Sequence, residues 1–223
     1  MKIYTRKGDS GSTGQFMGGR VSKDDYSMSA IGSLDETNCY IGLVRNKIRN
    51  MSVIRSKDII YERIERELVT VQSALFDMGA IVSTNIDWLA KDDNIDQVVP
   101  VNNLRDIDVV ALEALIDQMD EQLPPLVNFV LPNGNELHCI CQIARAVCRR
   151  AERDAVSWLQ HIKDNYNCDT SKIKDSNLLV YLNRLSDFLF VFSRYVDTDE
   201  SKWMGRSKHK NPNIQLELFN DQK

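Results

Sequence analysis

The chain has 223 residues, of which 43% are hydrophobic and 27% charged, and its formal net charge is −4. This composition favours one folded domain with a substantial core and excludes global disorder. The acidic balance disfavours sequence-neutral nucleic-acid binding, and no apolar run reaches the ~18 residues of a membrane helix. The N-terminus lacks the apolar stretch of a signal peptide, so we expect a cytoplasmic protein without nucleic-acid or membrane partners.

Residues 1–27 are predicted to form an irregular loop, because five of the ten glycines fall in a short stretch of this segment. Glycines allow backbone N–H groups to approach an anion, and the neighbouring hydroxyl, Arg and Lys side chains suit phosphate. The segment lacks the Gly-Lys-Ser/Thr end of a Walker A loop. A phosphate-binding loop and a flexible N-terminal arm therefore both remain open. The five glycines are Gly8, Gly11, Gly14, Gly18 and Gly19.

Five amphipathic helices follow, each marked by apolar residues three or four positions apart. They are predicted over residues 27–48, 60–82, 104–119, 135–162 and 178–196. The segment 85–101 is predicted to be a linker, and 128–134 a short apolar strip closed by a turn. Because no segment shows strand alternation, the pattern predicts an all-α five-helix bundle. We expect one domain over residues 1–197 and a polar C-terminal tail over 198–223.

Five cysteines, an odd number, disfavour a full disulfide framework. Cys39, Cys141 and Cys148 fall in apolar-periodic segments, where we expect buried free thiols. Cys139 and Cys141 are two residues apart on a predicted helix, so they do not face one metal ion together. No second Cys or His pair has zinc spacing, so the sequence predicts no resident metal site.

The fourth predicted helix carries three arginines four residues apart, namely Arg145, Arg149 and Arg153. Like charges in such a row repel one another. At ~100° per residue the row begins beside the apolar stripe and drifts to the opposite side, so the bundle core cannot cover it. The row therefore faces water, with Glu152 and Asp154 as partners, or another subunit, where guanidinium groups would bind a polyanion.

Two further polar side chains could complete such a site. Asp35 in the first predicted helix could pair with an arginine of the fourth, or could be a surface acid. Asn183 lies at the edge of the apolar stripe of the last predicted helix. Asparagine is a poor helix-interior residue, so we expect a specific partner there. An ordinary hydrogen bond between two helices is the alternative.

Six motifs occur in the order typical of one known family. They are Tyr4-Thr-Arg-x-Gly8-Asp9-x-Gly11, Gly19-Arg-Val-Ser-Lys23-Asp-Asp25, Gly32-x-x-Asp35-Glu36, Leu123-Pro-Pro-Leu with Asn128-Phe129-x-Leu-Pro132, Arg145-Ala-Val-Cys-Arg149-Arg-Ala-Glu-Arg153, and Tyr181-Leu-Asn183-Arg-Leu-Ser-Asp187. Together they resemble the ATP:cob(I)alamin adenosyltransferases of the propanediol-utilisation type. The resemblance runs from about residue 1 to 197.

The resemblance implies a five-helix bundle that assembles as a homotrimer with active sites between subunits. It assigns catalytic roles to Asp35 and Arg149, which would form an ion pair, and to Phe129, whose ring would crowd the lower face of the corrinoid. It also implies a set of ATP-contacting positions in the N-terminal loop and the last two long helices. These are Thr5, Arg6, Lys7, Gly8, Thr13, Lys23, Arg149, Arg150, Glu152, Arg153 and Asn183.

The implied reaction is attack of Co(I) on the 5′ carbon of ATP, which gives adenosylcobalamin and releases triphosphate. The side chains of Arg6, Lys23, Arg149 and Arg153, together with Mg²⁺, would stabilise the leaving anion. An apolar wall at Phe129 would expel the axial ligand from Co(II) and so favour its reduction. The implied partners are ATP, the corrinoid, a corrinoid reductase and an adenosylcobalamin-dependent enzyme.

The sequence departs from the family at a few positions of the loop. Lys7 stands where the family usually has threonine, and Gly14 removes a hydroxyl that usually follows Thr13. A non-catalytic corrinoid or ATP carrier or sensor on the same scaffold is the main alternative function. A helical interaction module is a second, because Gln215-Leu-Glu-Leu-Phe219 in the tail resembles a sliding-clamp docking peptide. Packing of this peptide on the bundle is the simpler interpretation.

Overall fold

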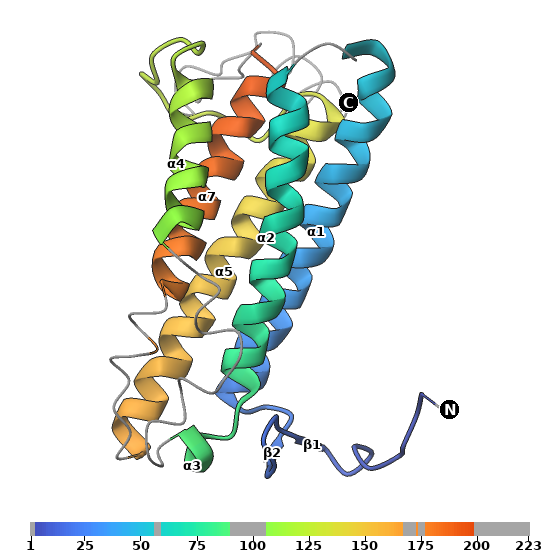
Figure 1. Cartoon of the computed structure of the whole chain (residues 1–223), viewed down its shortest axis with the longest axis vertical. Coiled ribbons are helices and arrows are strands. Elements are labelled where there is room, and N and C mark those ends of the chain that lie inside the picture. Colours follow the sequence, from blue (N-terminus) through green and yellow to red (C-terminus); the bar gives the residue numbers. More distant parts are fainter. Residues whose placement is uncertain (1–2, 56–58, 90–105, 167–172, 174–176, 199–223) are drawn as a thin grey trace, which may run out of the picture.

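The computed structural model describes residues 3–55, 59–89, 106–166, 173 and 177–198. Five long helices lie side by side in an elongated bundle, which confirms the predicted helical fold (Figure 1). Among the described helices, none is long and apolar enough to cross a membrane. The helices are α1 (Tyr26–Arg55), α2 (Ile59–Ser83), α4 (Asp106–Asp120), α5 (Glu136–Asn165) and α7 (Leu178–Val196), with a short α3 (Ile86–Leu89).

The contacts between helices show which helices are neighbours and whether they are parallel or antiparallel. Helix α1 packs between α2 and α5, and α7 packs between α5 and α4. Contacts between α1 and α5 pair early residues of one helix with late residues of the other, as in the ion pair of Lys47 with Glu136 at 2.7 Å. These two helices are therefore antiparallel. Helices α4 and α7 are parallel, since Arg184 pairs with Glu113 and Arg194, further along, with Asp120.

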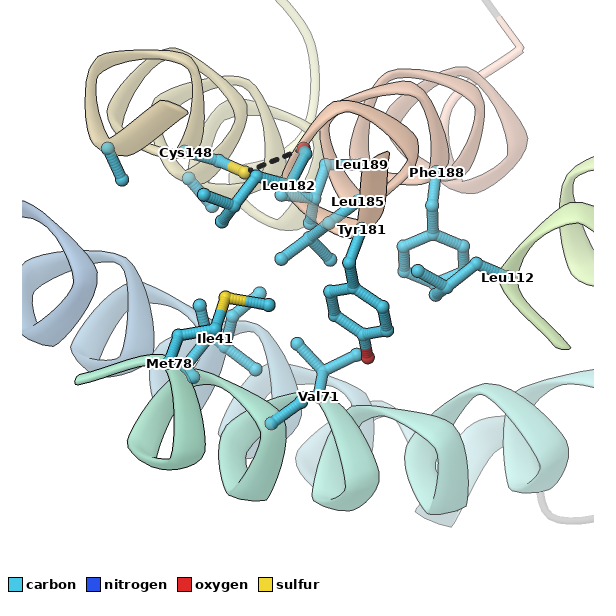
Figure 2. Packing of buried hydrophobic residues seen from close by; sticks show 14 of the residues in the cluster. Ile41, Val71, Met78, Leu112, Cys148, Tyr181, Leu182, Leu185, Phe188 and Leu189 are labelled. Atoms are coloured by element: carbon cyan, nitrogen blue, oxygen red, sulfur yellow. Dashed lines mark hydrogen bonds between the residues drawn. The ribbon is translucent and has the colours of Figure 1, made fainter. Parts of the chain in front are cut away.

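The predicted apolar stripes form one core. Figure 2 shows side chains of α2, α4, α5 and α7 meeting around Tyr181 and Leu185. Burial raises the pKa of the Cys141 and Cys148 thiols, and the Cys148 Sγ donates to the Leu182 carbonyl oxygen at 3.3 Å. Cys39 was expected to be buried, but it is exposed because it lies on the outer side of α1.

The N-terminal segment and the linker contain short elements that the sequence analysis missed. Strands β1 (Ser12–Gly14) and β2 (Arg20–Ser22) form an antiparallel hairpin in which Thr13 faces Val21. Three-residue strands are too short for an alternating pattern to be visible in sequence. Gly18 and Gly19 have φ values of 98° and 79°, which glycine adopts without strain and which close the hairpin. Helix α3 occupies the start of the predicted linker.

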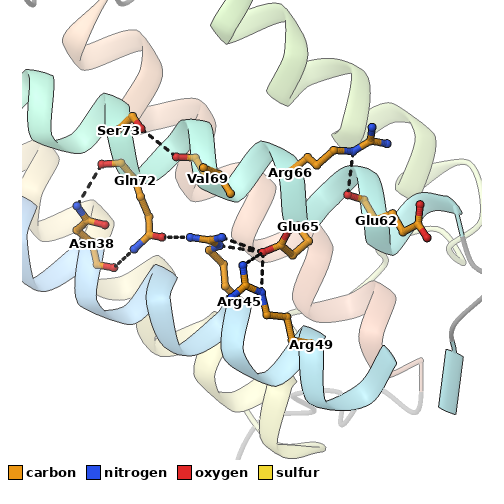
Figure 3. A network of polar contacts seen from close by, with 9 residues as sticks. All are labelled: Asn38, Arg45, Arg49, Glu62, Glu65, Arg66, Val69, Gln72 and Ser73. Carbon is orange, nitrogen blue, oxygen red and sulfur yellow. Dashed lines mark hydrogen bonds and ion pairs between the residues drawn. The ribbon is translucent and has the colours of Figure 1, made fainter. Parts of the chain in front are cut away.

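A polar network ties α1 to α2 on the outside of the core (Figure 3). Arg45 and Arg49 both pair with Glu65, at 2.9 and 2.8 Å. Gln72 bonds the Asn38 carbonyl oxygen at 3.3 Å and also accepts from Arg45. Burial acts to raise the pKa of Glu65, but the hydrogen bonds and positive charge of the two arginines outweigh it and hold that pKa below its usual value.

Candidate functional site

The arginine row lies on the outer face of α5, as its spacing predicts. Arg145 is half-buried, whereas Arg149 and Arg153 are exposed. The row therefore leaves the core progressively along the helix, because each step of four residues turns it by about 40°. Two guanidinium groups are presented to solvent on a face that their own bundle does not cover.

Local contacts orient the three arginines differently. Arg145 donates to Gln142 at 2.9 Å, and its guanidinium lies 5.9 Å from the centre of the Phe190 ring. Burial, followed by the positive charge of Arg149, lowers the pKa of Arg145. Arg153 donates to the Arg149 carbonyl oxygen at 3.0 Å. Arg145 is thus built into the bundle, and the other two positive charges form the exposed part of the row.

The neighbouring face of α1 brings carboxylates towards this row. Arg150 pairs with Glu36, and the Ser33 hydroxyl bonds the Asp154 carboxylate. Asp35 is exposed, and within the described residues no ion pair joins it to Arg149. The pair inside this chain is thus displaced by one residue on each helix from the expected one. Asp35 and Arg149 both keep exposed side chains.

Asn183 has a partner on the neighbouring helix. Its amide nitrogen lies 3.4 Å from Glu152 Oε1, so α7 and α5 are joined beside the arginine row. This is the hydrogen bond between two helices that was left open as the alternative. It also brings two of the expected ATP-contacting side chains together.

The N-terminal loop folds around its own backbone. Arg20 donates to the carbonyl oxygens of Lys7 and Ser12 at 2.7 and 2.9 Å, and the Lys23 amide donates to the Gly11 carbonyl oxygen at 2.9 Å. A Cβ added to Gly8 would lie 3.3 Å from the Lys23 ammonium nitrogen. The loop therefore places a cation against the backbone of a glycine, an arrangement that suits an anion.

The hairpin is docked on the bundle through the α2–α3 connection. Phe16 donates to the Ser83 carbonyl oxygen, and the Asn85 amide donates back to Phe16, both at 2.9 Å. Residues 3–7 in front of the hairpin are exposed and extend away from the bundle (Figure 1). Of the expected ATP contacts, Thr5, Arg6 and Lys7 are thus presented outward, whereas Thr13 is half-buried in β1.

A cavity of about 120 Å³ lies between the hairpin and the C-terminal end of α5. Its lining includes Arg20, Asp25, Asn85, His161 and Tyr166. His161 also stacks on Tyr26, with ring centres 4.7 Å apart. Sequence reasoning did not predict this cavity, because its lining comes from separate segments and Asn85, His161 and Tyr166 belong to none of the six motifs.

Phe129 lies on the connection between α4 and α5, and 79% of its side chain is exposed. Leu126 and Val127 on the same connection are also exposed. The predicted apolar strip is therefore not part of the core. Exposed apolar side chains grouped on a loop commonly mark a binding surface. The structure does not place this ring against the arginine row, which begins more than two helical turns into α5.

The site combines an exposed basic row, a cationic glycine loop and an exposed apolar loop on one helical bundle. Features of these kinds suit a polyanion and a ligand with a large apolar face. The cobalamin adenosyltransferase family matches residues 3–196 of the chain. The chain therefore belongs to this family.

Individual relatives agree with this assignment. The corrinoid adenosyltransferase of Bacillus subtilis is 34% identical over 200 residues, which cover 88% of this chain and 87% of the relative. The human corrinoid adenosyltransferase MMAB is 33% identical over 199 residues. This match covers 89% of this chain and 70% of the human protein. Both coverages extend across all five long helices.

Solved structures share the fold. A phenylalanine-to-histidine variant of the PduO-type ATP:corrinoid adenosyltransferase from Lactobacillus reuteri, complexed with cobalamin and ATP, has a TM-score of 0.67. It is 26% identical, and the match covers 92% of this chain and 97% of that one. An arginine-to-lysine variant of the same enzyme, complexed with ATP, has a TM-score of 0.66 at 27% identity.

Proposed function

We propose that the protein transfers the 5′-deoxyadenosyl group of ATP to the cobalt of cob(I)alamin, giving adenosylcobalamin and triphosphate. The observation that carries the proposal is the exposed pair Arg149 and Arg153 on a face that its own bundle leaves uncovered. Relatives named as corrinoid adenosyltransferases at 34% identity, and a structural neighbour complexed with cobalamin and ATP, supply the reaction and its substrates.

The chemistry requires cations placed before the reaction starts. A bond forms between cobalt and C5′ as the bond from C5′ to the triphosphate oxygen breaks, and the electron pair leaves with the triphosphate. Arg149 and Arg153, with Arg6 and Lys23 from the loop, are the side chains we assign to this charge. Guanidinium groups fixed in position stabilise developing charge better than mobile water does. The remaining loop positions would hold ATP in line with cobalt.

We propose that the active form is a homotrimer with its sites between subunits. The arginine row is uncovered in its own bundle, and residues 3–7 extend away from that bundle (Figure 1). Two surfaces that differ from one another, repeated on each copy, produce a closed ring when the rotation between copies closes. In this arrangement Asp35 of one copy would reach Arg149 of the next.

Phe129 would act on the corrinoid. Cob(II)alamin carries an axial ligand on its lower face, and that ligand disfavours reduction to Co(I). An apolar ring pressed against this face would displace the ligand without replacing it. Phe129 is 79% exposed, which supports this role.

The other components follow from the substrates. Mg²⁺ would enter with the triphosphate, since this ion is usually held through substrate phosphates and few protein carboxylates. A reductase would supply the electron, and an adenosylcobalamin-dependent enzyme would use the product. We propose a cytoplasmic protein whose catalytic domain spans residues 1–197, followed by the tail 198–223.

The test is an anaerobic mixture of the purified protein, chemically reduced cob(I)alamin, ATP and Mg²⁺, followed by the corrinoid absorption spectrum. Light-sensitive adenosylcobalamin that forms only with protein supports the proposal. Binding of ATP and corrinoid without product would instead support the carrier or sensor alternative. Absence of binding would reject both functions.

A further inference from the structure

The segment 121–135, which carries Phe129, is attached at both ends to the last turn of α7. We propose that Arg194 in this turn, and Asp197 directly after it, are positioning residues that hold Phe129 against the corrinoid. This inference rests on the proposed function, because it assigns Phe129 to the lower corrinoid face. Neither residue belongs to the motifs that point to ATP or to the corrinoid.

Arg194 holds the N-terminal end of the segment. Its side chain is only 2% exposed, and it donates to the Pro124 carbonyl oxygen at 2.7 Å. A second guanidinium nitrogen lies 3.6 Å from the Asp120 carboxylate at the end of α4. A buried guanidinium is stable only when acceptors satisfy it, so these bonds are strongly favoured. Pro125 follows directly and restricts the backbone that leads to Leu126.

Asp197 holds the C-terminal end. Its carboxylate accepts from the Asn135 amide at 2.5 Å, and the Asn135 side chain donates to the Val196 carbonyl oxygen at 2.8 Å. Asn135 also caps α5, because its side-chain oxygen accepts from the His138 amide at 2.9 Å. The junction is tight, since a Cβ added to Gly134 would lie 2.7 Å from the Asp197 carboxylate.

Between these two anchors the apolar side chains of Leu126, Val127 and Phe129 are exposed. The bonds of the two anchors therefore fix the backbone on both sides of Phe129. An apolar ring displaces a cobalt ligand only if the ring keeps its position when the ligand approaches. Loosening either anchor would let the ring recede and the ligand return.

The chemistry separates this role from a general structural one. Co(I) has no axial ligand, so adenosylation of cob(I)alamin does not need a ring on the lower face. Co(II) must lose its ligand before it gains an electron. Weakening an anchor should therefore slow the reaction that begins with cob(II)alamin and a reduced flavin, which donates the electron, and spare the reaction that begins with cob(I)alamin.

The experiment uses the full-length protein and the variants Arg194→Met and Asp197→Ala. Adenosylation is measured from cob(I)alamin prepared with titanium(III) citrate, and from cob(II)alamin with reduced flavin. The fraction of four-coordinate Co(II) in the presence of ATP is measured by electron paramagnetic resonance. We expect each variant to lose about tenfold or more in the cob(II)alamin reaction and in the four-coordinate signal, and under about twofold from cob(I)alamin.

Conservative variants and a matched control complete the test. Asp197→Asn keeps an oxygen acceptor and should restore most of the cob(II)alamin rate. Arg66→Met removes an exposed arginine that donates to the Glu62 carbonyl oxygen on its own helix, and should match wild type in both reactions. Equal losses in the two reactions, or an unchanged four-coordinate signal, would overturn the positioning role. Wild-type protein that makes no product even from cob(I)alamin would instead reject the proposed function.

Discussion

The two loops that we assign to the substrates are built in different ways. The N-terminal hairpin is docked by backbone bonds of Phe16 to the α2–α3 connection, and its cations lie in exposed residues before and after that point. The Phe129 segment is fixed at both ends by side chains of α7, and its apolar residues lie between the anchors. The hairpin is thus fixed at its centre, with its binding groups on either side. The Phe129 segment is fixed at its ends, with its apolar residues between them.

This difference matches the two ligands. A triphosphate is bound by charge, which acts over several ångströms and tolerates adjustment of long Arg and Lys side chains. Exclusion of a metal ligand depends on contact, and a shift of one ångström removes it. The N-terminal loop, which binds an anion, therefore needs long side chains that can adjust. The Phe129 segment, which excludes a ligand by contact, needs a rigid backbone. The arginine row of α5 combines the two properties. The helix fixes its backbone, and its long side chains can still adjust to an anion.

Removal of Arg149 should have the largest effect. Arg149→Ala deletes an exposed guanidinium that we place on the triphosphate, so we expect kcat to fall by about 10²- to 10³-fold. The thermal unfolding midpoint should stay unchanged, since the side chain is exposed. The measurement is turnover from cob(I)alamin beside a melting curve, with Arg66→Ala as the matched helical arginine. Turnover near wild type would remove Arg149 from the site.

Removal of the apolar ring should affect the cob(II)alamin reaction and not the binding of ATP. Phe129→Ala should lower the rate from cob(II)alamin by about tenfold and leave the apparent KM for ATP within about twofold of wild type. Steady-state kinetics with varied ATP and reduced flavin measure both quantities. Phe129→Leu, which stays apolar, is the control and should retain an intermediate rate. A large change in KM for ATP would contradict the separation of the two loops.

Loosening of the hairpin should give the reverse pattern. Arg20→Ala removes the bonds to the Lys7 and Ser12 carbonyl oxygens. A bond of this kind contributes about 1 kcal/mol, and a loss of about that size in the order of the loop should raise the KM for ATP about fivefold with little change in kcat. Titration of ATP in the cob(I)alamin reaction checks this. If Arg20→Lys restores KM fully, charge and not loop geometry is the cause.

The α1–α2 network should affect stability alone. The pKa of Glu65 is lowered in the folded chain, so its ion pairs stabilise the fold above the ordinary carboxyl range, and this contribution disappears as pH falls through the folded pKa. Glu65→Gln should therefore cost about 1 kcal/mol or less at pH 7, and this difference should shrink below about pH 4. Urea unfolding at both pH values measures it. A difference that grows in acid would refute the assignment.

Much of the bundle could be predicted because helical periodicity is a local property. Residues such as Leu34, Leu75 and Leu185 occupy the core positions that their spacing predicts. The drift of Arg149 away from the core is confirmed for the same reason. Cys39 was wrongly expected to be buried, because residues next to an apolar stripe can lie on either side of it.

The hairpin, the cavity and the loop anchors could not be predicted from local pattern. Strands β1 and β2 are three residues each, and their pairing depends on a turn and on the docking of Phe16 to Ser83. His161 stacks on Tyr26, although the two residues are far apart in the sequence. Such contacts are set by helix order and not by the spacing of residues along one helix.

The sequence by itself determined the helical class, the core-facing sides of the helices and the basic face of α5, because hydrophobic burial and helical geometry act within each segment. It also carried the motifs that predicted the family, and the comparisons confirm the family. Tertiary structure alone decided that Arg150 pairs with Glu36, that Asn183 bonds Glu152, and that α7 holds the Phe129 segment. Those contacts join residues distant in sequence, and only the packing of the helices brings their side chains within bonding distance.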